Sequence, residues 1–263
     1  MRQLQPSSDA SGLAEVEFDV CGTRLSLLVR PGTIDERVIH EVVRTYRIDE
    51  LVERFKSTAP MTVFDIGGHI GSFSVTVATL LPQCVVHVFE PVPANFDVLV
   101  RNIRHAGLER SVHAHRVGIS GRSGFVALED IGLSPDRRNT GGHSVLGPQA
   151  SDVPPDGRAF VELVPLGALL DRETRVDLLK IDCEGAEFDI LYNLTPAQLA
   201  KIDSMVGEIH SCSGFVGTQT AGLEWNASAL TQFLARRYAT VETDHRMVTD
   251  SAVLETFHAT NRG

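Results

Sequence analysis

The sequence lacks the features that mark membrane proteins and nucleic-acid-binding proteins. No apolar stretch reaches the ~18 residues of a membrane-spanning helix, and no basic segment followed by an apolar one opens the chain. The formal net charge of −10 leaves no basic field to attract nucleic acid or an acidic membrane surface. These absences predict a cytoplasmic protein that binds small molecules and has no nucleic-acid or membrane partner.

Cysteine is scarce as well. The four cysteines lie far apart and form no Cys-x-x-Cys pair, which argues against a zinc site and predicts reduced thiols. With 263 residues and 43% hydrophobic content, the chain is long enough to bury a large core. We expect one large α/β domain over residues 60–263, preceded by a small appendage over residues 1–59.

The pattern after residue 60 alternates apolar strands with helical segments, which predicts a parallel, doubly wound sheet. Helices are expected at 70–81 and 94–106. Strands are expected at 61–66, 84–89, 111–119, 123–129, 159–164, 176–181, 202–210, 238–243 and 252–259.

The appendage is predicted to hold a hairpin and a helical stretch. Alternating apolar residues on either side of Gly22 indicate the hairpin, whose exposed edge is a candidate for pairing in a homo-oligomer. Thr33 and Glu36 predict a capping box for a helical stretch that ends near Phe55 and is broken over residues 46–49. We expect the appendage to cover one side of a cofactor cleft.

A glycine-rich turn follows the strand at 61–66. Asp65 precedes Gly67, Gly68 and Gly71, and Glu90 ends the next strand, 25 residues after Asp65. Glycine lets a backbone approach a ligand closely, and an acid at the second strand end can accept hydrogen bonds from ribose hydroxyls. This layout predicts a pocket for a nucleotide-type cofactor.

The glycine spacing argues against a dinucleotide. Counted from Gly67, the third and sixth places of the dinucleotide fingerprint hold His69 and Ser72. An acid at Asp65 would also repel a pyrophosphate at the turn. A ligand with a positive centre and no phosphate fits better, and S-adenosylmethionine has a sulfonium, an amino group and a free ribose.

Three segments stand out: Phe-Asp-Ile-Gly-Gly-His-Ile-Gly-Ser-Phe-Ser at 64–74, Phe-Glu-Pro-Val-Pro at 89–93, and Asp-Leu-Leu-Lys-Ile-Asp-Cys-Glu-Gly-Ala-Glu at 177–187. Together they resemble the FkbM family of S-adenosylmethionine-dependent methyltransferases. The resemblance covers about residues 60–212. One departure is Gly68-His69, where family members more often have Ala-Asn or Gly-Asn.

The resemblance implies a class I methyltransferase sheet, Rossmann-like and seven-stranded, in the order 3-2-1-4-5-7-6 with the last-inserted strand antiparallel. Its cleft lies at the carboxyl ends of the strands, where the strand order reverses. Strands 1 to 3 would hold the cofactor, and strands 4 and 5 would face the acceptor. The cofactor-binding residues implied are Asp65, Gly67, Gly68, His69, Gly71, Glu90, Pro91, Asn95, Gly118, Ile119 and Asp182.

The two strands on the acceptor side end in polar residues. Asp182 and Glu184 follow one strand, while Glu208 and His210 share a face at the end of the other. His210, oriented by Glu208 or Asp182, is our candidate for a base that deprotonates a hydroxyl acceptor. The alternative, slightly less favoured, is that Asp182, Glu208 and His210 hold a divalent metal ion, which the resemblance itself does not imply.

Other polar residues have structural interpretations. Lys180 is expected to pair with Glu208, and Glu187 to interact with a helix dipole. Glu184, His143 and Trp225 are candidates for contact with the substrate. His143 belongs to the glycine- and proline-rich connection over 130–158, whose length is typical of a lid.

The function expected from these features is methyl transfer to a small molecule, with O-methylation of a specialised metabolite favoured. C- or N-methylation is the alternative, and an aromatic wall at Trp225 or Tyr192 would support it. A nucleotide-binding oxidoreductase or sensor is the more distant alternative, against which the glycine spacing speaks.

Overall fold

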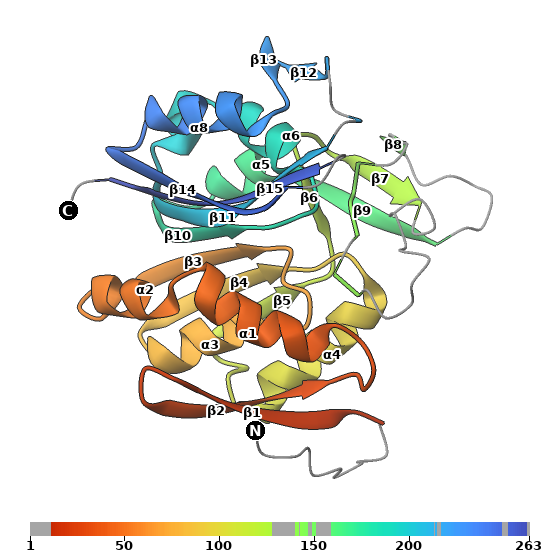
Figure 1. Ribbon diagram of the computed structural model, residues 1–263, viewed down its shortest axis with the longest axis vertical. Helices are drawn as coiled ribbons and strands as arrows, with labels where there is room; N and C mark the ends of the chain where they lie inside the picture. The colour runs from red at the N-terminus through yellow and green to blue at the C-terminus, as the bar shows by residue number, and fades with distance from the viewer. Residues whose placement is uncertain are drawn as a thin grey trace.

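The centre of the protein is a seven-stranded sheet (Figure 1). The structure is a computed structural model that describes residues 12–127, 140–141, 143–146, 149–150, 159–212, 214, 217–248 and 252–261. Across the sheet the order is β14-β15-β11-β10-β3-β4-β5. The strands are β3 (Met61–Ile66), β4 (Cys84–Phe89), β5 (Val112–His115), β10 (Val176–Ile181), β11 (Ile202–Cys212), β14 (Thr240–Val248) and β15 (Ala252–Thr260).

Strand direction and order define where the sheet can open for a ligand. Strands β5, β4, β3, β10 and β11 pair in parallel, whereas β15 is antiparallel to both β11 and β14. Numbered along the chain, these strands lie in the order 3-2-1-4-5-7-6. The strand order reverses between β3 and β10. The connections that leave the carboxyl ends of these two strands run to opposite sides of the sheet, which leaves a crevice between them.

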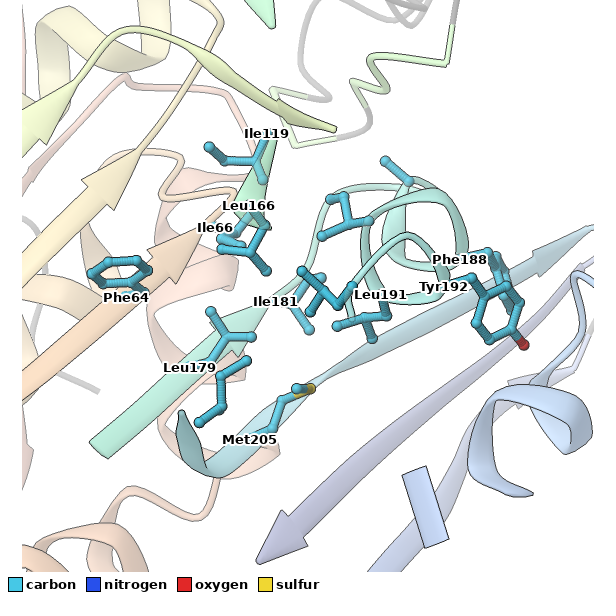
Figure 2. Packing of buried hydrophobic residues seen from close by; sticks show 14 of the residues in the cluster. Phe64, Ile66, Ile119, Leu166, Leu179, Ile181, Phe188, Leu191, Tyr192 and Met205 are labelled. Carbon is cyan, nitrogen blue, oxygen red and sulfur yellow. The ribbon is translucent and has the colours of Figure 1, made fainter. Parts of the chain in front are cut away.

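Both faces of the sheet are buried, as the apolar strand sequences require. Phe64, Leu179 and Met205 belong to one apolar cluster with Phe188 and Leu191 of α6, and Figure 2 shows these side chains together. The alternate strand residues belong to a second cluster on the opposite face. The covering helices are α3 (Ser72–Leu80), α4 (Pro93–His105), α5 (Leu166–Leu170), α6 (Glu187–Tyr192), α7 (Pro196–Leu199) and α8 (Ala227–Ala235).

The appendage consists of a hairpin, β1 (Ala14–Val20) with β2 (Thr23–Val29), and two helices, α1 (Asp35–Thr45) and α2 (Ile48–Phe55). Asn102 of α4 ties the hairpin to the core, because its Oδ1 accepts from Leu28 N at 2.6 Å and its Nδ2 donates to Leu28 O at 3.0 Å. The apolar residues of the appendage share one cluster with α3 and the sheet. A division at residues 59/60 stays a prediction.

In the appendage, the structure corrects one local expectation and confirms another. No capping box forms at Thr33 and Glu36: the N-cap of α1 is Ile34, with no side-chain cap, and Thr33 Oγ1 donates to Arg30 O instead. The break after α1 is confirmed, with Arg47 in the left-handed region.

The expected strand 111–119 divides in two. Its second part is β6 (Gly118–Ser120), which joins β9 (Phe160–Pro165), β7 (Gly124–Ala127) and β8 (Gln149–Ala150) in a separate small sheet. A further short pair is β12 (Gln219–Thr220) with β13 (Leu223–Glu224). Most of the expected lid over 130–158 lies outside the described residues. Among the described helices, none has the length and apolarity needed to cross a membrane.

Candidate active site

A cavity of about 620 Å³ opens at the carboxyl ends of β3, β4, β10 and β11. Its wall is made by the loops after β3 and β4, by the ends of β10 and β11, by α1 of the appendage and by Gly141, His143 and Val145. The appendage therefore covers one side of the crevice. The volume lies within the range of about 300–1,000 Å³ that is usual for small-molecule sites.

Glu90 is the acid on the β4 side of this cavity. Its Oε2 accepts from His69 N at 2.8 Å and its Oε1 accepts from Val92 N at 2.8 Å, with Asn95 Nδ2 at 3.4 Å from the same oxygen. The residue is 4% exposed. Burial raises the pKa of Glu90 to about 7, although these hydrogen bonds favour the charged form. The carboxylate is thus fixed in place before any ligand binds.

His69 follows the glycine turn with a φ of +50°, an uncommon value for a residue with a side chain. Its Nε2 lies 2.9 Å from Thr140 Oγ1, and its Nδ1 is buried with no hydrogen-bond partner among the described residues. Burial lowers the pKa of His69 to about 4, so the ring is neutral at neutral pH. His69 as a residue lines the cavity, although its Nδ1 is not exposed to it.

A polar network holds His69 from the appendage side. Arg30 donates from Nε to Asp35 Oδ2 at 2.8 Å and from a terminal nitrogen to Asn95 Oδ1 at 2.9 Å. Thr140 Oγ1 donates to Asp35 Oδ1 at 2.7 Å. Although burial opposes ionisation, the hydrogen bonds from Arg30 help to hold the pKa of Asp35 below its ordinary value. This network was missed at the sequence level, because nothing in the pattern connects residues 30 and 35 with residues 69 and 140.

Glycine is required in the turn by the chain itself. A Cβ on Gly67, which has a φ of +79°, would lie 1.8 Å from the carbonyl oxygen of Asp182. A Cβ on Gly68 would lie 2.1 Å from Val88 Cγ2, and one on Gly71 2.6 Å from Leu99 Cδ1. Only Gly67 of the three lines the cavity. The close approach that we expected toward a ligand is, for Gly68 and Gly71, an approach to neighbouring side chains.

Asp65 lies behind the turn and does not line the cavity. It is fully buried, 3.2 Å from Lys180 Nζ, and accepts from Ser74 Oγ at 2.6 Å. Lys180 in turn donates to Gly67 O at 2.6 Å. The expected Lys180–Glu208 pair is therefore replaced by a Lys180–Asp65 pair, with Asp182 Oδ2 at 3.8 Å. Asp65 supports the turn from below, and its position does not support direct contact with a cofactor.

The acceptor side brings together the predicted residues of β10 and β11. His210 Nε2 lies 3.8 Å from Asp182 Oδ1, 3.6 Å from Glu184 Oε2 and 3.8 Å from Glu208 Oε2. All four residues line the cavity. We call these four residues the acceptor cluster.

Electrostatics in the acceptor cluster favour protons on Glu184, on Glu208 and on the imidazole. Although burial opposes ionisation of Asp182, Lys180 and His210 hold the pKa of that carboxyl below its ordinary value. Burial raises the pKa of Glu184 to about 7 and that of Glu208 to about 8. Burial alone would lower the pKa of His210, but Glu187 and Glu184 raise it well above its ordinary value. His210 is then an imidazolium at neutral pH and cannot serve as the base that we expected. It would lose this proton only if a bound cation took the proton's place on the ring.

Glu187 is the residue that sequence reasoning underestimated. Its Oε1 lies 3.0 Å from His210 Nδ1 and also accepts from Cys183 N, while its Oε2 accepts from Gly185 N. The side chain is fully buried. Glu187 therefore orients His210 and closes the 182–187 turn. The short Glu-Gly-Ala-Glu spacing was the available signal, but a helix-dipole role explained it equally well.

The remaining predicted site residues divide by position. Pro91, Asn95, Ile119 and His143 line the cavity, whereas Gly118 does not. Trp225 does not line it either: its ring stacks on Phe188 at 5.6 Å between centroids, and its Nε1 donates to Thr220 Oγ1 at 3.0 Å. A substrate contact by Trp225 is not supported by this position.

Sequence comparisons assign the family. Residues 65–238 match the model of the methyltransferase FkbM domain, and because this match spans more than half of the chain, the protein belongs to the FkbM methyltransferase family. The family expected from the three motifs is thereby confirmed.

Three curated relatives agree with the family assignment. Methyltransferase 1 of Beauveria bassiana is 29% identical over 183 residues, covering 62% of this chain and 70% of the relative. Methyltransferase sdnD of Sordaria araneosa is 29% identical over 175 residues, covering 58% and 67%. The 31-O-demethyl-FK506 methyltransferase FkbM of Streptomyces tacrolimicus is 27% identical over 179 residues, covering 60% and 69%.

Proposed function

We propose that the protein transfers a methyl group from S-adenosylmethionine to a hydroxyl group of a small specialised metabolite. The observation that carries this proposal is that Glu90 and the acceptor cluster line the same cavity. An acid fixed for ribose hydroxyls and a second polar group for an acceptor are what the two substrates of such a transfer require. Family membership supports the methyl transfer itself.

The donor half of the cavity fits S-adenosylmethionine. Glu90 Oε2 accepts one hydrogen bond, from His69 N, which leaves acceptor capacity on that oxygen for a ribose hydroxyl. His69 lines the same cavity. The cavity-lining side chains Ile66, Phe89 and Ile119 supply apolar surface for a purine. When bound, this donor supplies a methyl group already activated by its sulfonium.

The protein's own contribution is to align the acceptor and to remove its proton. Alignment and exclusion of water can supply on the order of 7–11 kcal/mol of the barrier reduction. The oxygen–methyl bond forms as the methyl–sulfur bond breaks, and the hydroxyl proton leaves to a carboxylate of the acceptor cluster. Glu184 is the best placed, because its side chain is 36% exposed on the cavity wall, against 10% for Glu208.

The acceptor cluster favours a hydroxyl over a carbon or an amine acceptor. Its carboxylates can accept a proton from a hydroxyl, and one relative is named for methylation at an oxygen. The position of Trp225 and Tyr192 does not favour the aromatic wall expected for C- or N-methylation. Trp225 packs on Phe188, and the hydroxyl of Tyr192 donates a hydrogen bond to Glu224 O.

Transfer of a labelled methyl group tests the proposal. The protein is incubated with methyl-labelled S-adenosylmethionine and a panel of hydroxylated metabolites, and each product is located by mass spectrometry and NMR. We expect the label on an oxygen and formation of S-adenosylhomocysteine. Label on carbon or nitrogen would contradict the hydroxyl acceptor, and failure of S-adenosylmethionine to bind would contradict the donor.

A further inference from the structure

The acceptor cluster contains a ligand set that a general base alone does not explain. Asp182 and Glu208 offer carboxylate oxygens and His210 offers an imidazole nitrogen, and these three atoms lie within 4.8 Å of one another. Two carboxylates and one imidazole form a donor set that suits magnesium or manganese ions.

The atoms lie too far apart for hydrogen bonds and slightly farther apart than ligands that share one ion. His210 Nε2 lies 3.8 Å from both Asp182 Oδ1 and Glu208 Oε2, beyond the about 2.7–3.2 Å of a hydrogen bond. Ligands that share one ion at about 2.1 Å and at angles of 90–120° lie roughly 3.0–3.6 Å apart. The observed spacing therefore leaves room for an ion with small adjustments of the side chains.

In two of the three ligands, His210 and Asp182, the polar atom that does not face the other ligands is bound by a residue outside the ligand set. His210 Nδ1 is held by Glu187, whose own oxygens are fixed by the backbone N–H groups of Cys183 and Gly185. This bond leaves Nε2 as the nitrogen that faces Asp182 and Glu208. A carboxylate behind a histidine is the usual support of a metal-binding imidazole, because it fixes the ring and its tautomer.

Asp182 is anchored in the same way from the appendage. Tyr46 of the appendage, 1% exposed, donates its hydroxyl to Asp182 Oδ2 at 2.8 Å, and Lys180 Nζ lies 3.8 Å from the same oxygen. The other oxygen, Oδ1, is the one nearer His210. Each anchored ligand thus presents one defined atom to a common point, and hydrogen-bonded carboxylate ligands are a second property of metal sites.

We propose that Asp182, Glu208 and His210 bind one divalent cation of the magnesium or manganese class, with Glu187 and Tyr46 as positioning residues. The role given to the ion rests on the proposed function: it binds the acceptor hydroxyl and lowers its pKa, so that the oxygen attacks the methyl group as its proton passes to Glu184. All three ligands line the cavity, so an ion held by them would be open to an acceptor that binds there.

Manganese binding to the full chain tests the site. The free Mn²⁺ signal is followed by electron paramagnetic resonance during titration of the protein without any methyl donor, with Mg²⁺ as the competitor. We expect one equivalent of Mn²⁺ to bind. Affinity should fall more than about 100-fold in Asp182→Asn and His210→Ala, and about 10–100-fold in Tyr46→Phe and Glu187→Gln.

Glu41→Gln is the matched control, because Glu41 is also a carboxylate on the cavity wall but lies outside the ligand set. Its Mn²⁺ affinity should stay within about twofold of the parent, whereas equal losses in Glu41→Gln and Asp182→Asn would indicate diffuse attraction and overturn the site. Each variant is first shown to be folded by circular dichroism. An absence of Mn²⁺ binding to the folded parent protein, or unchanged affinity in Asp182→Asn and His210→Ala, would also overturn the site.

A second readout separates the ion from the methyl transfer. Chelation should abolish turnover, Mg²⁺ or Mn²⁺ should restore it, and the affinity for S-adenosylhomocysteine should not change. Full turnover after chelation would contradict the role of the ion while leaving the transfer intact. Mn²⁺ binding in a protein that transfers no methyl group would instead keep the ion site and contradict the proposed function.

Discussion

The two halves of the cavity differ in how their carboxylates are held. In the donor half, the oxygens of Glu90 accept hydrogen bonds from His69 N and Val92 N. In the acceptor half, the carboxylates of Asp182, Glu184 and Glu208 lie 3.6–3.8 Å from His210 Nε2, beyond hydrogen-bond distance. In the donor half the backbone itself binds both oxygens of the acid. In the acceptor half Tyr46 and Glu187 hold Asp182 and His210 from outside, and the atoms that face one another keep a spacing that an ion and an acceptor would complete.

The largest effect is expected where the two halves meet. An alanine at Gly67 would place its Cβ 1.8 Å from Asp182 O and would need a φ of +79°. We expect Gly67→Ala to lower the free energy of unfolding by about 4 kcal/mol or more. Gly107→Ala is the control, since Gly107 has a φ of +68° but nothing within 4 Å of its Cβ, and should cost only about 1–2 kcal/mol. Equal losses in chemical denaturation would contradict the close approach.

The next effect concerns the donor half alone. Glu90→Gln removes a charged acceptor and leaves either His69 N or Val92 N facing an amide NH₂ group. Loss of about 3 kcal/mol of hydrogen bonding should weaken S-adenosylhomocysteine binding about 100-fold in calorimetry. Asp97→Asn changes an exposed acid of α4 and should leave the affinity unchanged. Undiminished affinity in Glu90→Gln would remove Glu90 from the donor site.

The acceptor half should behave in the opposite way. His210→Ala is expected to lower kcat about 100-fold while the affinity for S-adenosylhomocysteine changes less than about threefold. The reason is that His210 lies in the acceptor cluster, where it would hold the proposed ion. A parallel loss of donor affinity would show that the two halves are not separate, and an unchanged kcat would remove His210 from the reaction.

A smaller effect is expected from pH. Burial raises the pKa of Glu90 from 4.5 to about 7 and that of Glu208 to about 8. The folded protein therefore holds protons that the unfolded chain releases, so stability is gained below these pKa values and lost as the pH rises through them. We expect the Tm of the ligand-free protein to fall by several degrees, about 2–4 °C per kcal/mol, between about pH 6 and pH 9.

Calorimetric melts of Glu90→Gln show how much of this fall in Tm comes from the donor half of the cavity and how much from the acceptor half. If Glu90 contributes as its pKa indicates, the fall in Tm over this pH range becomes smaller in the variant, and the rest belongs to the acceptor cluster. A Tm that rises over the same range would contradict the raised pKa values.

The smallest effect is expected outside both halves. Trp225→Phe keeps the ring that stacks on Phe188 and loses the hydrogen bond to Thr220 Oγ1. We expect a loss of about 1 kcal/mol in stability and turnover within about twofold of the parent. A strong loss of turnover in steady-state kinetics, with a folded protein, would restore Trp225 as a substrate contact.

The sequence predicted those parts of the fold and site that depend on local pattern. The apolar runs at 61–66 and 84–89 coincide with β3 and β4, because buried parallel strands are continuous apolar segments. Acids at strand ends were likewise visible, since carboxyl ends of parallel strands meet at one edge. Glu90, Asp182, Glu184, Glu208 and His210 all line the cavity for that reason.

The parts that escaped prediction depend on contacts between distant segments. Tyr46 reaches Asp182 across 136 positions, and Thr140 reaches Asp35 across 105. Nothing in the periodicity of either segment indicates its partner. The ion pair of Asp65 with Lys180 was not predicted either. A strand pattern shows on which face of the sheet a residue lies, but not which side chain binds it there.

The most direct test of the account is a pair of calorimetric titrations of the parent protein, one with S-adenosylhomocysteine and one with NADH. The cavity described here, with Glu90 fixed for a ribose and further acids on its wall that would repel a diphosphate, predicts one equivalent of S-adenosylhomocysteine bound and no heat from NADH. Binding of NADH together with no response to S-adenosylhomocysteine would contradict it.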